Sequence, residues 1–226
     1  MKTTQTFLNY FLEHQTLVID GKIGPKSKFA IKLAIDKLKG KCSKEDLIWN
    51  KSFMFIGIRT DNDLDNTFDD WFVLIENESK LIAVPSSTVS GVSGIYKYVK
   101  IWIRGRVGVG TIKENQQIDY ILIKGTHSGW ASWSGGLGFL FQDKHISIYR
   151  GATIKNGKWV IDKNNLVLRD IGGGFNVHSW RGWLVNYVAS LSEGCQVCKA
   201  NDWAIIFPII TKNAQRNRVT YTLLQF

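Results

Sequence analysis

The fold class is decided by the stretches FMFIGIR at residues 53–59 and WFVLI at residues 71–75. Both are rich in the aromatic and β-branched residues that favour strands, and both are short enough to be strands. Similar runs follow, bounded by Gly, Asn and Asp, which favour turns. They lie at residues 81–84, 120–123, 146–149, 159–161, 175–178 and 219–224, while residues 203–210 fit either a strand or a helix. We therefore predict a mainly β domain over residues 46–226.

The first 45 residues have a helical pattern instead. Phe7 and Phe11 are spaced so that they share one helical face. Asp20 and Gly21 mark a turn, and Pro25 suits the first turn of a second helix, where its missing N–H costs nothing. We predict a small helical module over residues 1–45.

Composition narrows the possible partners. The chain has 226 residues, a net charge of +10 and a normal hydrophobic fraction of 44%. A basic surface attracts polyanions. The sequence has no basic run interleaved with aromatics of the kind that would indicate a nucleic-acid partner. No apolar run is long enough for a signal peptide or a membrane span, so we expect synthesis in a cytoplasm and no stable membrane insertion. The charge favours a monomer.

The chemistry is concentrated in NVHSWRG at residues 176–182 and SEGCQV at residues 192–197. Cys195 is the candidate nucleophile, because a thiol becomes reactive when a base can remove its proton. His178, at the end of a predicted strand, is the candidate base. Gly194 would let the backbone turn and a substrate carbonyl approach, with backbone N–H groups stabilising an oxyanion.

These residues resemble the L,D-transpeptidase family, whose signature is a strand-borne His, a gap, and then Ser/Thr-His-Gly-Cys. Ser192, Gly194 and Cys195 match that signature, while Glu193 replaces the second His. A phage and prophage branch of the family is more similar still, and the resemblance spans residues 50–226 in order. Its further blocks match residues 57–59, 66–70, 125–129, 148–150 and 176–182.

A second resemblance concerns the helical module. Residues 21–35 resemble the small peptidoglycan-binding module of cell-wall hydrolases, with its Asp-Gly, Gly-Pro and Lys-rich helix start. Any helix–turn–helix is the alternative. Together the two resemblances imply an L,D-transpeptidase-like β-sandwich catalytic domain behind a peptidoglycan-binding-like module, as in a bacteriophage endolysin.

The implied function is a cysteine peptidase that degrades bacterial peptidoglycan at stem-peptide bonds through a Cys195 thioester. Such a hydrolase needs no cofactor and no metal, and would reach the wall only after release from the cytoplasm. An L,D-transpeptidase proper is one alternative, and a non-catalytic wall-binding or virion protein of the same fold is another.

Further residues are candidates for substrate binding or for structure. His127 could replace the missing second His, and Arg150 or Arg181 could bind a substrate carboxylate in a bidentate manner. Ser192 and Gln196 flank the predicted nucleophile. Each of these side chains has a structural role as its alternative.

Two further patterns have structural interpretations. Asp69 and Asp70 are expected to form a fold-holding ion pair with Arg59. The Cys195–Cys198 spacing is formally that of a zinc or redox pair, but we expect Cys198 simply to pack in the core.

Overall fold

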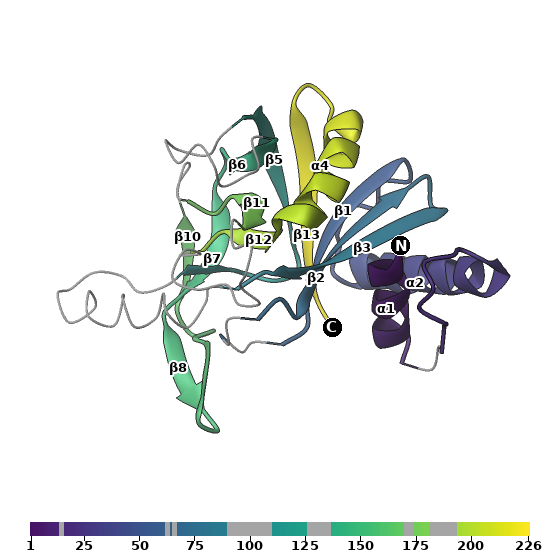
Figure 1. Ribbon diagram of the computed structural model, residues 1–226. Helices are drawn as coiled ribbons and strands as arrows, with labels where there is room; N and C mark the ends of the chain where they lie inside the picture. The colour runs from purple at the N-terminus through teal and green to yellow at the C-terminus, as the bar shows by residue number, and fades with distance from the viewer. Residues whose placement is uncertain are drawn as a thin grey trace.

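The computed structural model describes residues 1–13, 16–61, 64, 67–89, 110–125, 137–169, 174–180 and 194–226. Two helices precede a strand-rich remainder, which confirms a mainly β fold with a small helical part at its N-terminal side (Figure 1). The described elements are α1 Lys2–Phe11, α2 Pro25–Lys44, β1 Phe53–Arg59, β2 Asp70–Glu76, β3 Lys80–Ser87, β4 Gly110–Ile112, β5 Gln116–Lys124, β6 Gly138–Gln142, β7 Ile146–Arg150, β8 Ala152–Lys155, β9 Lys158–Ile161, β10 Leu166–Arg169, β11 Val177–Trp180, β12 Gln196–Lys199, α4 Ala200–Asn213 and β13 Arg218–Gln225.

Eight of these strands form a closed barrel in the order β1-β13-β5-β6-β11-β12-β3-β2. Strand β13 closes it, because it pairs in parallel with β1 and antiparallel with β5. This corrects the expected β-sandwich. The hydrogen bonding runs round a closed ring of eight strands. A sandwich would instead leave unpaired edges on two facing sheets.

The barrel interior is filled by alternate side chains of its strands. Phe55, Phe72 and Tyr221 belong to one buried cluster, because successive residues of a strand point to opposite faces. Helix α4 packs against the same cluster through Trp203, whose indole Nε1 donates to the Gly138 carbonyl at 2.9 Å. The ambiguous stretch at residues 203–210 is therefore helical.

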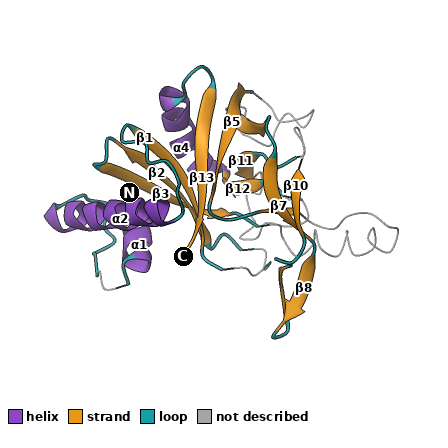
Figure 2. Cartoon of the chain, turned by 180° about the vertical axis from the view of Figure 1, so that it is seen from behind, coloured by secondary structure: helices purple, strands orange, loops and turns teal. Residues whose placement is uncertain are grey.

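A second, three-stranded sheet in the order β10-β7-β4 extends this core. Its residues Ile112, Ile146 and Ile148 are buried in the same cluster as the barrel interior. The β8–β9 hairpin projects from the molecule on the side away from α1 and α2 (Figure 2). No helix in the described part of the chain combines the length and apolarity needed to cross a membrane.

Helices α1 and α2 cover the outer face of β1, β2 and β3. Phe7 and Leu38 from the helices are fully buried in a cluster that also contains Ile56 and Val73 from the strands. Helix α2 begins at Pro25, as predicted. The helical module and the barrel thus share one hydrophobic cluster, while the boundary at residue 45 stays a prediction.

A buried arginine joins the barrel to the second sheet. Arg59 is fully buried, donates to the carbonyl oxygens of Thr88 (3.1 Å) and Ile112 (2.8 Å), and pairs with Glu114 at 3.3 Å. Arg59 does not contact Asp70 directly, as the expected ion pair would: the Asp70 carboxylate accepts from the amide and hydroxyl of Thr88, both at 2.7 Å, and attracts Arg59 across this residue. Thr88 stands between the two charges, because its hydroxyl also accepts from Arg59 Nε.

Candidate functional site

The parallel strand pair β11 and β12 positions the candidate site. His178 is in register with Val197, and the Gln196 amide donates to the Asn176 carbonyl at 2.9 Å. Cys195 lies directly before β12, which begins at Gln196, and Gln196 is paired with Val177, the residue before His178. The chain therefore brings Cys195 and His178 to the same end of one parallel strand pair. The predicted approach of the His178 ring to the Cys195 sulfur stays a prediction.

Cys195 differs from the other two cysteines in its exposure. Its side chain is partly exposed and its Sγ donates to the Gly174 carbonyl at 2.9 Å, whereas Cys42 and Cys198 are fully buried. Burial raises the pKa of the Cys42 thiol to about 11 and raises the pKa of Cys198 well above its usual value. Cys195 is therefore the cysteine that a substrate can reach.

The His178 ring has a defined orientation. It is 7% exposed, and its Nδ1 lies 2.7 Å from the carbonyl oxygen of Ser179. A carbonyl oxygen can only accept, so Nδ1 carries the proton and Nε2 of the neutral ring keeps a lone pair. This is the tautomer that a general base at Nε2 requires. Sequence reasoning missed the role of Ser179, because a backbone carbonyl has no residue-type signal.

Gly194 is required by its contact with Phe175. A Cβ at Gly194 would overlap the buried Phe175 ring, so a larger residue would displace either the ring or the segment that carries Cys195. The Phe175 carbonyl accepts from the Tyr120 hydroxyl at 2.8 Å, and burial raises the pKa of Tyr120. Phe175 and Tyr120 support the site from the barrel core, and the sequence singled out neither for this role.

Arg150 is the one predicted substrate-binding cation in the described part of the chain. It ends β7, and its guanidinium carbon lies 5.7 Å from the centroid of the Phe175 ring. Because the same ring contacts the Gly194 position, Arg150 belongs to the surroundings of the candidate site. A cation there suits a substrate carboxylate.

Gln196 differs from its expected role. Its side chain has no exposed surface, and neither Nε2 nor Oε1 of its side-chain amide has a hydrogen-bond partner among the described residues. It is in register with Val177, whose side chain is buried in the barrel cluster, so the amide points inward. The register of β12 therefore turns Gln196 away from a substrate bound at the surface.

Three other candidates, His127, Ser192 and Arg181, lie outside the described residues. The metal interpretation meets a geometric difficulty, because the Cys198 side chain is fully buried in the barrel cluster whereas the Cys195 side chain is partly exposed. The predicted packing role of Cys198 is confirmed by its complete burial in the barrel cluster. Among the described residues, no group of three or more His, Cys, Asp and Glu side chains is arranged to hold a metal ion.

Comparisons with known proteins add no assignment. No protein-family model matches the chain, and no curated protein sequence is significantly similar to it. Support for a function therefore comes from the β11–β12 pair, its side chains and the motif resemblance.

Proposed function

We propose that the chain is a cysteine peptidase of bacterial peptidoglycan, an endolysin-type hydrolase with an L,D-transpeptidase-like catalytic domain. One observation carries the proposal. A partly exposed thiol directly precedes β12, and a histidine held through Nδ1 lies on β11, the parallel neighbour of β12. The resemblance of the motifs around Cys195 and His178 supplies the substrate, a peptidoglycan stem peptide.

The reaction begins when the Cys195 thiol leaves the Gly174 carbonyl and transfers its proton to His178 Nε2. The thiolate sulfur bonds to the carbonyl carbon of the scissile peptide bond, and the C–N bond breaks as the leaving amine takes the proton from the imidazolium. A thioester joins the acyl group to Cys195. Water, deprotonated by His178, then releases a carboxylic acid and restores the thiol.

The backbone hydrogen bond between Gln196 and Asn176 limits which N–H groups can stabilise the oxyanion. The Gln196 N–H is committed to the Asn176 carbonyl, so it does not serve a developing negative charge. The amides of Gly194 and Cys195, next to the nucleophile, are the donors proposed for the oxyanion. An acceptor amine that attacks the thioester in place of water would give transpeptidation from the same intermediate.

Mass spectrometry of purified muropeptides tests the proposal. The wild-type chain should release peptide fragments carrying one added water, whereas products joined to a second stem peptide would show transpeptidation. Cys195→Ala should abolish both, and Cys198→Ala, the matched control, should keep most of the activity because its thiol lies in the core. Turnover by Cys195→Ala would refute the proposal, and equal loss in both variants restored by zinc would favour a metal site.

A further inference from the structure

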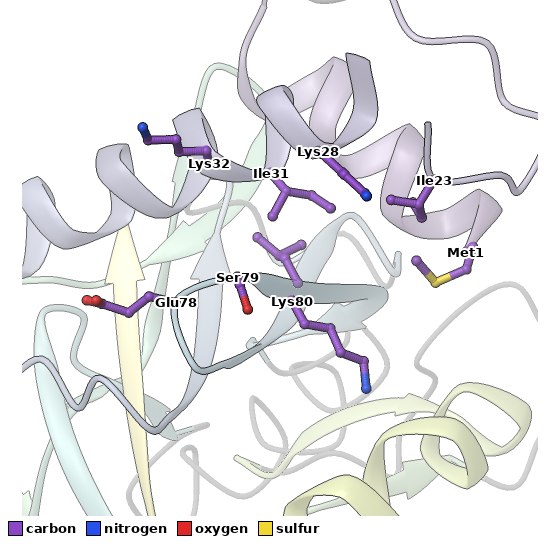
Figure 3. Close-up of a pocket in the computed structure, with 9 residues that line it drawn as sticks. Met1, Ile23, Lys28, Ile31, Lys32, Glu78, Ser79 and Lys80 are labelled. Carbon is purple, nitrogen blue, oxygen red and sulfur yellow. The ribbon is translucent and has the colours of Figure 1, made fainter. Parts of the chain in front are cut away.

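A cavity outside the candidate active site lies between α2 and the turn that joins β2 to β3 (Figure 3). Its volume of about 480 Å³ is within the range of small-molecule sites. The apolar side chains of Ile23, Ile31 and Leu81 contribute to its lining. The cavity therefore offers an apolar interior made jointly by the helical part and the barrel.

Lysines surround this interior. The Lys28 ammonium reaches over the cavity towards Ile23, while Lys32 and Lys80 line it with their stems and point their ammonium groups outward (Figure 3). Lys28 and Lys32 form no ion pair with any residue that the structure describes. The mouth of the cavity is thus positively charged.

The acidic residue at this mouth is already engaged. Glu78 accepts from Lys39 at 3.0 Å and from the Trp49 indole at 2.8 Å, and these hydrogen bonds lower its pKa. Its carboxylate is therefore paired with Lys39 and not with Lys28 or Lys32. An anionic group at the mouth would therefore find Lys28 and Lys32 on its rim, neither of them ion-paired with a described residue.

We propose that this cavity binds an anionic phospholipid of a membrane surface, with an acyl chain inside and the phosphate at the mouth against Lys28 and Lys32. An apolar interior with ammonium groups at the rim matches an amphiphile, since lysines bury their stems and keep their charge in water. A phosphate polymer without an apolar portion would leave this interior unused. Val18 and Phe29 of the same helical part are 77% and 60% exposed, a combination with lysines that suits a membrane interface.

Calorimetric titration with hexyl, octyl and decyl phosphate tests the chemistry. Each CH₂ that enters the cavity should tighten binding roughly fourfold, and inorganic phosphate should bind far more weakly than any of them. Wild-type protein should also sediment with vesicles of phosphatidylcholine and phosphatidylglycerol but not with phosphatidylcholine alone. Equal affinity for phosphate and the alkyl phosphates, or no binding to either, would overturn the proposal.

Matched variants separate this cavity from general charge attraction. The double variant Lys28→Glu with Lys32→Glu should lose alkyl phosphate and vesicle binding. Lys26→Glu with Lys44→Glu changes the charge of the same helix equally at positions that do not line the cavity, and it should retain alkyl phosphate binding. Equal loss in both would show unspecific attraction. Since no readout involves Cys195, the result is independent of the peptidase proposal.

Discussion

At the residue scale, burial separates the three thiols. Iodoacetamide near neutral pH should alkylate Cys195 first in the folded protein, because Cys42 and Cys198 are buried with raised pKa values and stay protonated. Peptide mapping by mass spectrometry would give the labelling rate of each cysteine. All three should react in denaturant. Equal labelling of Cys42 and Cys195 in the folded chain would contradict the described burial.

Gly194 gives a second prediction at this scale. Gly194→Ala should lower peptidase activity by roughly 100-fold, because the new methyl group displaces the segment carrying Cys195 and small misplacements at a reacting centre are costly. Gly40→Ala is the matched control: its methyl group would meet open space within α2, and stability should rise by up to about 1 kcal/mol. Muropeptide turnover and thermal unfolding would be measured for both. Full activity in Gly194→Ala would remove the steric argument.

The candidate site was predictable in part. Cys195, His178 and Gly194 could be named because residue type and spacing carry the information. The carbonyls of Gly174 and Ser179 could not, because every residue has one and only the folded backbone aims it. The inward turn of Gln196 depends on a strand register that the local sequence does not encode.

At the element scale, the helices and the barrel should unfold together. Phe7→Ala removes a fully buried ring from the cluster that α1 and α2 share with the strands, and should cost about 3–5 kcal/mol of unfolding free energy. Phe29→Ala, the same change at a side chain that is 60% exposed, should lower the unfolding free energy by much less than Phe7→Ala does. Urea unfolding followed by circular dichroism and tryptophan fluorescence should give coincident transitions. Separate transitions would instead show an independent helical module.

Local patterns located most elements but not their neighbours. The strand runs and the start of α2 at Pro25 were readable because alternation and turn residues act over a few positions. The stretch at residues 203–210 is ambiguous in sequence because it is a short apolar run and contains Pro208, which disfavours a helix interior. The parallel pairing of β1 with β13 joins segments far apart in sequence, so no local sequence pattern predicts the closed barrel.

At the scale of the whole molecule, Arg59 should control the attachment of the second sheet. Arg59→Lys should lower the free energy of unfolding by about 3–5 kcal/mol, because one ammonium group cannot bind two carbonyls and Glu114 at once in a buried site. Hydrogen exchange in β4 should quicken. Arg218→Lys, the same change in a partly exposed pair with Asp143, should cost less than about 1 kcal/mol. Equal costs would show that burial does not govern these pairs.

The place of β13 in the ring governs how the chain can reach its folded state. Every other barrel strand precedes β13 in sequence, yet β1 and β5 both need it as a hydrogen-bonding neighbour. During synthesis on the ribosome, β1 and β5 each keep an unpaired edge until β13 has been made. The long loop between β1 and β13 must then close, which slows folding. Exposed edges recruit other chains. The interval before β13 emerges is thus when the nascent protein is most prone to aggregate, and chaperone demand should concentrate there.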